Sequence, residues 1–422
     1  MITVKEANAI ILSNTYDFGI EEVPFLAAVG RVLKEDITAD RDFPPFHRVA
    51  MDGIAINHRF FEYGVRDFKI EGIQPAGSPQ ETMENAAHCY EVMTGAVLPN
   101  NTDTVIRYED VAINTLMATV TVDQIKEGQN IHSKGSDKTN KSILIKKNTV
   151  ISPAEIGVLA TVGKRLVKVA KQPKVLIVST GDELVEVGQT PLAHQIRKSN
   201  VHTLEALLKR FHISSETAHL ADHKEAITSK IASYLNTYDV LLFSGAVSKG
   251  KFDFLPDVLE GLGVQKLFHR VTQRPGKPFW MGLASSLSSE RGVNGDGHAE
   301  KCNKKNTVVF AFPGNPVSAY VNCLVYFYPW YAKCMQIGRA KKTAVLSEEV
   351  SFKPNLTYFL PVKLSCENGQ LMALPIRGNG SGDLACLVEA DGFIELPKQE
   401  ELSYQKGHVF PIHSYRDSLF LF

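Results

Sequence analysis

Three segments of small and polar residues could together bind an anion. They are Ser179–Leu184, Ser244–Gly250 and Pro313–Ser318. Small residues let backbone N–H groups approach an oxyanion closely, and the serine and threonine hydroxyls add hydrogen-bond donors. Any one of these segments is equally consistent with an ordinary turn between a strand and a helix. Three of them at one edge of a sheet favour an anion-binding pocket.

Carboxylates surround the same segments. Asp182 and Glu183 lie in the first segment, Asp239 precedes the second, and Asp253 follows it. Carboxylates beside a phosphate-binding loop would repel an anionic ligand unless a hard divalent cation such as Mg²⁺ bridged them, so a metal ion is implied. In the alternative interpretation, Asp239 caps the entry to a strand and Asp253 caps a helix.

A basic turn could supply positive charge to the same pocket. Residues 273–278 read Gln-Arg-Pro-Gly-Lys-Pro, so two prolines stiffen the backbone around Arg274 and Lys277. A rigid turn can hold Lys277 as a fixed point charge toward a phosphate or another oxyanion. A solvated basic loop is the ordinary alternative.

Apolar runs before the three segments predict the element that positions them. Val175–Val178, Val240–Phe243 and Val308–Phe312 are short and continuous, as in strands covered on both faces of a parallel sheet. Leucines at helical spacing over residues 204–208 predict a covering helix between the first two runs. An open, mostly parallel α/β sheet domain is therefore expected over residues 171–335.

Two capping boxes predict where helices begin outside this sheet. Thr3 pairs with Glu6, and Ser152 pairs with Glu155, at the spacing that satisfies the first N–H groups of a helix. Since both helices flank a long stretch without helical periodicity, a discontinuous helical and linker domain is expected over residues 1–41 and 138–170.

Short β-type runs fill the remaining parts of the chain. Val, Ile and Thr runs broken by Gly, Pro and Asn predict an inserted β-rich module over residues 42–137. Similar runs after residue 335 predict a small β-barrel-like domain over residues 336–422. Within it, the glycine-rich run Gly378–Gly382 is expected to form a flexible turn.

Composition argues against several classes of protein. The 46 Lys and Arg residues balance the 46 Asp and Glu residues, whereas a general nucleic-acid or anionic-membrane binder needs a basic excess. The six cysteines lack C-x-x-C and zinc-type spacing, so they are expected to be free thiols in a reducing compartment. No secretory signal pattern and no run of about 18 uncharged apolar residues are found. We therefore expect a soluble cytoplasmic protein.

Six motifs together resemble the molybdopterin molybdenumtransferase family, to which the gephyrin E domain also belongs. In chain order they are P-P-F-x-x-x-A-M-D-G (Pro44–Gly53), M-T-G-A (Met93–Ala96), S-T-G-D-E-L (Ser179–Leu184), S-G-x-V-S-x-G (Ser244–Gly250) followed by Asp253, R-P-G-K-P (Arg274–Pro278) and P-G-N-P-V-S-A (Pro313–Ala319). They span nearly the whole chain in the order that the family shows.

The resemblance implies an elongated four-part subunit that forms a homodimer. It also implies a reaction, in which molybdenum from molybdate is inserted at the dithiolene of adenylylated molybdopterin and AMP is released with the assistance of Mg²⁺. Molybdopterin adenylyltransferase and molybdoenzyme apoproteins are the protein partners that the same reaction implies. Such a reaction needs mainly positioning and charge neutralisation, so no protein nucleophile or general base is assigned.

Motif matching also implies roles for individual residues. The implied catalytic residues are Asp52, Glu183, Asp239 and Asp253, of which Glu183 and Asp253 would bind the metal. The implied substrate contacts are Thr94, Ser179, Thr180, Gly181, Asn200, Ser244, Gly245, Ser248, Gly250, Lys277, Pro313, Gly314, Asn315 and Pro316. Asp52 and Thr94 would reach the α/β domain of the other subunit.

Two other functions compete with this interpretation. A molybdopterin adenylyltransferase uses the same kind of α/β domain, but it is expected to consist of that domain alone. A non-catalytic, gephyrin-like dimeric scaffold would be favoured by the loss of Asp52 and Glu183, and both are present. The chain departs from the family pattern at Val49, at Ala246 and over residues 132–137.

Overall fold

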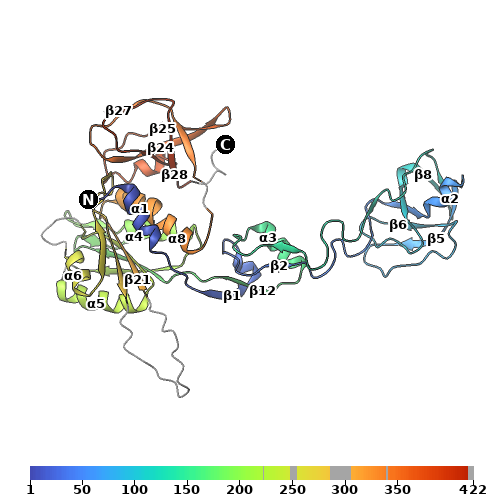
Figure 1. Ribbon diagram of the computed structural model, residues 1–422, viewed down its shortest axis with the longest axis horizontal. Helices are drawn as coiled ribbons and strands as arrows, with labels where there is room; N and C mark the ends of the chain where they lie inside the picture. The colour runs from blue at the N-terminus through green and yellow to red at the C-terminus, as the bar shows by residue number, and fades with distance from the viewer. Residues whose placement is uncertain (222, 248–253, 286–305, 339–340, 417–422) are drawn as a thin grey trace, which may run out of the picture. The chain divides into compact units, whose positions relative to one another are not determined.

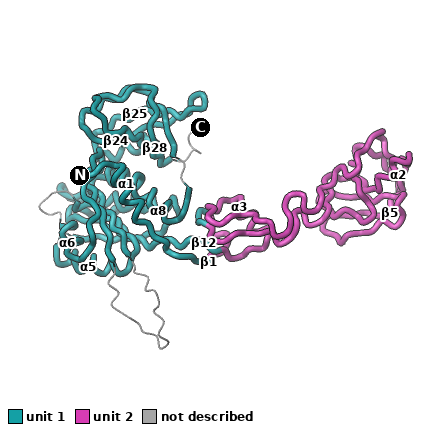
Figure 2. The backbone as a smooth tube through the Cα atoms, viewed as in Figure 1, with its two compact units in different colours: residues 1–22, 30–32, 168–422 teal, residues 23–29, 33–167 magenta. Residues whose placement is uncertain are grey.

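Contacts within a computed structural model divide the chain into two units (Figure 2). Unit 1 contains residues 1–22, 30–32 and 168–422, and unit 2 contains residues 23–29 and 33–167. The structure describes residues 1–221, 223–247, 254–285, 306–338 and 341–416. The chain passes between the units at strands β1 (Ile20–Pro24) and β12 (Leu166–Ala170).

A six-stranded sheet forms the centre of unit 1 (Figure 1). Its strands, in spatial order, are β16 (Ser215–Leu220), β13 (Val175–Thr180), β17 (Val240–Ser244), β21 (Asn306–Phe312), β20 (Trp280–Ser285) and β18 (Gln265–His269). The first four are parallel, and β20 and β18 run antiparallel to their neighbours. The predicted open, mostly parallel sheet is confirmed.

Alternating side chains bury both faces of this sheet. On β13, Val175 and Ile177 belong to one apolar core, while Leu176 and Val178 belong to the core on the opposite face. The first core is covered by α1 (Val4–Ser13), α4 (Asn200–Lys209), α7 (Pro316–Asn322) and α8 (Tyr328–Cys334). The second is covered by α5 (Lys224–Thr237) and α6 (Leu255–Gly261) (Figure 1). Continuous apolar strands are what such two-sided burial requires.

Helix α1 begins where its capping box predicts. The Thr3 hydroxyl accepts a hydrogen bond from the Glu6 backbone N–H, and the Glu6 carboxylate accepts from the Thr3 N–H. Its apolar face packs on the core of the α/β sheet, where the indole N–H of Trp330 donates to the carbonyl of Asn14. Residues 1–22 thus fall in the same unit as the α/β sheet, whereas residues 1–41 were expected to form a helical and linker domain with residues 138–170.

Helices α7 and α8 are joined without a break by one turn of π-helix, Cys323–Phe327. The residues at both junctions keep right-handed helical dihedrals, so the three segments form one continuous buried helix. An extra residue in a turn rotates the following side chains around the axis, and such turns are frequent at functional sites.

A closed five-stranded barrel follows in the same unit. It comprises β24 (Thr357–Glu367), β25 (Gln370–Pro375), β22 (Thr343–Leu346), β28 (Val409–Ser414) and β26 (Gly392–Leu396), and β24–β26 pairing closes it. The predicted β-barrel-like domain is confirmed. Strand β19 (Gln273–Arg274), from the α/β segment, also pairs with β24. The remaining short elements are β23 (Val350–Ser351), β27 (Ser403–Tyr404) and α9 (Cys386–Glu389).

Unit 2 contains a second six-stranded sheet, as expected for a β-rich module. Its order is β7 (Thr104–Arg107), β4 (Gly53–Ile56), β6 (Cys89–Val92), β5 (Asp67–Gln74), β9 (Met117–Val120) and β8 (Val111–Asn114). Its smaller elements are η1 (Phe25–Ala28), β2 (Ile37–Thr38), β3 (Arg48–Val49), α2 (His58–Glu62), η2 (Tyr108–Asp110), β10 (Ile131–His132), β11 (Ile143–Ile145) and α3 (Pro153–Thr161).

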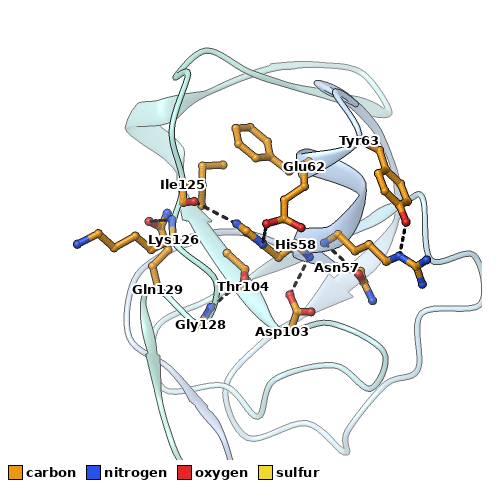
Figure 3. Close-up of polar contacts among 12 residues, drawn as sticks. Asn57, His58, Glu62, Tyr63, Asp103, Thr104, Ile125, Lys126, Gly128 and Gln129 are labelled. Carbon is orange, nitrogen blue, oxygen red and sulfur yellow. Dashed lines mark hydrogen bonds and ion pairs between the residues drawn. The ribbon is translucent and has the colours of Figure 1, made fainter.

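The buried side chain of His58 ties helix α2 to a loop of unit 2 (Figure 3). Its Nε2 lies 3.0 Å from the carbonyl oxygen of Ile125, and a carbonyl can only accept, so Nε2 carries the proton. The His58 backbone N–H donates to the Asp103 carboxylate over 2.7 Å. These contacts fix the helix against the end of the sheet.

Among the residues that the structure describes, none of the helices is long and apolar enough to span a bilayer.

Replacing Ser152 tests the second capping box. The hydroxyl of Ser152 accepts from the N–H of Ala154, so Ser152→Ala should destabilise the start of α3 by about 1 kcal/mol. Hydrogen-exchange mass spectrometry should show faster exchange in peptides covering α3. Ser136→Ala, at an exposed serine outside any helix, should leave that exchange unchanged. Equal exchange in both variants would contradict the capping role.

Candidate functional site

A cleft of about 930 Å³ opens in unit 1 at the carboxyl ends of β13, β17 and β21. This is the edge of an open α/β sheet at which ligands generally bind. The structure brings twelve of the predicted site residues to its wall: Ser179, Thr180, Gly181, Glu183, Asn200, Ser244, Gly245, Lys277, Pro313, Gly314, Asn315 and Pro316. Its volume lies at the upper end of small-molecule sites.

The side-chain amide of Asn200 holds three of the cleft segments together. Asn200 begins α4, and its Nδ2 donates to the Ser244 hydroxyl over 2.8 Å and to the Gly314 carbonyl over 2.6 Å. Ser244 is the last residue of β17, and Gly314 lies just after β21. One residue therefore fixes the spacing between loops that are far apart in sequence.

Glycine is required where two of these loops touch. Gly245 has φ +113°, and a Cβ there would lie 2.6 Å from the Thr180 hydroxyl oxygen. That hydroxyl is itself buried, so it has little room to move. Next to it, Ala246 has φ +53°, in the left-handed region that favours glycine. The alanine methyl group is therefore held in a backbone conformation that is more strained than it would be for glycine.

Glu183 is the acidic member of the cleft wall. It is exposed and immediately precedes β14 (Leu184–Val185), which pairs in parallel with β15 (Ile196–Arg197). Its own carbonyl accepts from the N–H of Ile196 over 2.9 Å, which anchors the backbone. The short pairing presents the carboxylate at the cleft.

Positive charge exceeds negative charge on the described wall of the cleft. The cations are Arg197, Lys198, Arg274 and Lys277, against the single carboxylate of Glu183. Lys198 pairs with Glu186, which lowers the pKa of Glu186 and offsets this lysine locally. Arg274 and Lys277 are exposed on the turn between β19 and β20. The wall thus suits a ligand with several negative charges.

Ser179 has a partner at the edge of the cleft. Its hydroxyl lies 3.0 Å from Nδ1 of His219, at the end of β16. Burial is the main cause that lowers the pKa of His219, and the positive charge of Lys198 lowers it further. The Ser179 hydroxyl can also donate to the Ala218 carbonyl over 3.4 Å, so two partners hold it at the cleft edge.

The C-terminal β domain contributes cleft residues that the sequence analysis missed. They are Leu356, Ser381, Gly382 and Leu384. Asn315 Nδ2 donates to the Ser381 hydroxyl over 2.9 Å, and the Val317 N–H donates to the Ser381 carbonyl over 3.2 Å. The run Gly378–Gly382, expected to be only a flexible turn, therefore forms part of the wall. Its glycine-serine composition was the one available signal.

Asp239 does not join the cleft, which corrects its predicted catalytic role there. It directly precedes β17, whereas the cleft begins at Ser244 at the other end of that strand. Its Oδ2 accepts the backbone N–H of Lys174 over 2.8 Å. The alternative interpretation, in which it caps the entry to a strand, describes this geometry. Ser248, Gly250 and Asp253, which were also predicted, lie outside the described residues.

Asp52 and Thr94 are brought together in unit 2. The Thr94 N–H donates to Asp52 Oδ1 over 2.6 Å. Hydrogen bonds from the Thr94 backbone and then from its side chain lower the pKa of Asp52, so it remains a carboxylate at neutral pH. The two motifs that carry these residues therefore lie side by side and place one ionised carboxylate between them.

The donor set of the cleft is compatible with Mg²⁺. Within the described ranges, His, Cys, Asp and Glu form no cluster of three that could bind a metal by itself. Mg²⁺, however, usually binds one or two carboxylates together with phosphates of the substrate and waters. Glu183 supplies one such carboxylate.

Three family models match consecutive parts of the chain. The "MoeA N-terminal region (domain I and II)" matches residues 2–163, the "Probable molybdopterin binding domain" matches residues 176–333, and the "MoeA C-terminal region (domain IV)" matches residues 343–415. The three matches follow the order of the inserted β module, the α/β domain and the barrel.

Curated relatives match this chain over nearly all of its length. A molybdopterin molybdenumtransferase from Synechocystis is 38% identical and covers 98% of this chain and 100% of its own length. One from Staphylococcus aureus is 27% identical, over 97% of this chain and 95% of its own. The crystal structure of a molybdopterin biosynthesis MoeA protein from Pyrococcus horikosii matches with a TM-score of 0.78 and 28% identity, covering 99% and 100% of the two chains.

Two glycines of the cleft wall should respond differently to alanine. Gly245→Ala should lower the free energy of unfolding by roughly 1–3 kcal/mol, because the added methyl group meets Thr180 and the φ angle is left-handed. Gly314→Ala is the matched control, since its Cβ would meet its nearest atom, the Cα of Gly245, only at 3.7 Å. Thermal unfolding of both variants measures the difference, and equal midpoints would contradict the close approach.

Proposed function

Because the chain belongs to the molybdopterin molybdenumtransferase family, we propose that it inserts molybdenum from molybdate into adenylylated molybdopterin and releases AMP. The cleft carries this proposal. It joins strand-end glycines and hydroxyls, a cationic turn and one carboxylate in a single large site. These groups match a substrate that contains a pterin, a phosphoanhydride and a nucleotide.

The groups of the cleft act by positioning and charge neutralisation. Small residues at Gly181, Gly245 and Gly314 let the backbone approach phosphate oxygens. Lys277 and Arg274 offset the negative charge that builds up as the phosphoanhydride bond breaks. No protein nucleophile is needed for the release of AMP.

Mg²⁺ belongs to the proposal as the bound cofactor. Glu183 would hold it together with Asp253 and phosphate oxygens of the substrate. The ion would neutralise phosphate charge and orient the leaving group. The chain's own contribution is to place the Glu183 carboxylate on the wall that also carries Lys277.

The assembly and the cell compartment are also part of the proposal. We propose a cytoplasmic homodimer in which Asp52 and Thr94 act at the cleft of the other subunit, as the family resemblance implies. Asp52 suits this role because Thr94 keeps it ionised. Molybdopterin adenylyltransferase would supply the substrate, and molybdoenzyme apoproteins would accept the product.

The competing functions are less well supported. The matches to the N-terminal and C-terminal regions of MoeA cover parts that a lone adenylyltransferase domain is not expected to have. A scaffold without activity would not need Glu183 and Lys277 on one wall.

Glu183→Gln tests the proposed reaction. Adenylylated molybdopterin, molybdate and Mg²⁺ are supplied to the purified protein, and AMP release is followed by chromatography. We expect release by the wild type and a loss on the order of 100-fold in the variant, because a neutral amide cannot replace the charge of the carboxylate. Glu205→Gln, on α4 where Glu205 pairs with Lys209, should keep wild-type turnover. Absence of release by the wild type would support the scaffold.

Lys277→Met tests the anion-binding role of the turn. Calorimetric titration with AMP should show an affinity loss of roughly tenfold, because an ammonium–phosphate contact disappears. The affinity of the variant should also depend less on ionic strength. Lys266→Met, which removes a lysine paired with Glu260 on β18 and α6, should change neither property. An unchanged salt dependence in Lys277→Met would contradict the role.

A further inference from the structure

A buried polar network lies under the turn that carries Lys277. Gln273, Asn322 and Tyr326 have no exposed surface. The Gln273 side-chain Nε2 donates to the Asn322 Oδ1 over 2.9 Å, and its Oε1 accepts from the Tyr326 hydroxyl. Burial raises the pKa of Tyr326, so its hydroxyl remains a donor. Buried amides are costly unless each is satisfied, so this network has one stable arrangement.

The network holds the backbone of the turn directly. Gln273 Nε2 also donates to the Pro275 carbonyl over 2.8 Å, and Asn322 Nδ2 donates to the Gly276 carbonyl over 3.4 Å. The Lys277 carbonyl in turn accepts from the Val271 N–H over 3.1 Å. The carbonyl groups of three consecutive residues, Pro275, Gly276 and Lys277, are therefore all hydrogen-bonded.

Two residues four positions apart on the continuous α7–α8 helix contact the same buried amide, Gln273. Asn322 ends α7, and Tyr326 lies in the π-helical segment that follows. Both side chains reach Gln273, one through its nitrogen and one through its oxygen. Residues four apart lie on one face of a helix, so both polar groups meet a single buried amide.

Gly276 leaves no free space between the turn and the network. Its φ is +87°, and a Cβ there would lie 2.5 Å from Asn322 Oδ1 and 2.8 Å from Gln273 Nε2. Both atoms are hydrogen-bonded and buried, so they cannot move aside without breaking the network. The turn therefore packs directly against the two side-chain amides, and only a residue without a Cβ fits at position 276.

We propose that Gln273, Asn322 and Tyr326 are positioning residues that act through Lys277 and set its affinity for the phosphate of the substrate. Asn322 and Tyr326 lie off the cleft wall, and Gln273 borders the cleft with no exposed surface, so the three act through the turn and not through direct contact. The inference rests on the proposed function, because it assumes that Lys277 meets a phosphate. Without the network, the lysine would remain but would sample many positions, so each ligand contact would cost more entropy.

A double-mutant cycle with AMP as the probe tests this inference. Tyr326→Phe removes the hydroxyl that donates to Gln273. Tyr328→Phe is the matched control, since this buried hydroxyl on α8 donates to the Leu207 carbonyl on α4, over 2.7 Å, and not to the turn. Each change is made in the wild type and in Lys277→Met, and AMP affinity is measured by calorimetry alongside thermal unfolding.

We expect Tyr326→Phe to weaken AMP binding about threefold to tenfold in the wild type, because a buried acceptor loses its donor, and to change it little when Lys277 is absent. Tyr328→Phe should leave AMP affinity unchanged in both backgrounds although it also lowers the unfolding temperature. Gly276→Ala, which disturbs the network from the opposite side, should reproduce the loss of affinity.

Three results would overturn the inference. Equal effects of Tyr326→Phe with and without Lys277 would show a general structural role, and so would equal effects of the two phenylalanine variants. Normal AMP affinity in both Tyr326→Phe and Gly276→Ala would show that the network does not matter for binding. If Lys277→Met alone binds AMP normally, the phosphate contact of the proposed function fails, and this result identifies that failure separately.

Discussion

The cleft depends on hydrogen bonds from a single side chain. Asn200 donates from one nitrogen to the hydroxyl of the serine that ends one strand and to the carbonyl of a glycine just after another. Backbone pairing within the sheet aligns β17 and β21 but does not determine where the loops beyond them turn. The asparagine determines that, and it is itself fixed as the first residue of a helix packed on the sheet.

Charge is distributed in the cleft so that a polyanion and a cation can be held together. The cations lie on the segment before α4 (Arg197 and Lys198) and at the turn after β19 (Arg274 and Lys277), and the carboxylate of Glu183 precedes both in the chain. Lys198 is already neutralised by Glu186, so the turn with Arg274 and Lys277 dominates the attraction. Attraction of this kind orients a phosphorylated ligand as well as binding it.

Much of the fold and the centre of the site could be predicted, because both follow local rules. Capping boxes at Thr3 and Ser152 mark helix starts, and continuous apolar runs mark two-sided strands whose ends meet at one edge. Other features have no local signal. Ser381 meets Asn315 across 66 positions, and motif matching assigned Asp239 to the cleft although its position before β17 places it at the opposite end of that strand.

Strand β19 links the α/β segment to the barrel. Gln273 and Arg274 pair with Thr357 and Tyr358, at the start of β24, while β26 occupies the other side of that strand. A fragment beginning after the α/β domain would lack this partner and expose a row of unpaired backbone groups, which invites pairing with other chains. Because β19 leads directly into the turn that carries Lys277, removal of the barrel would also free one flank of that turn.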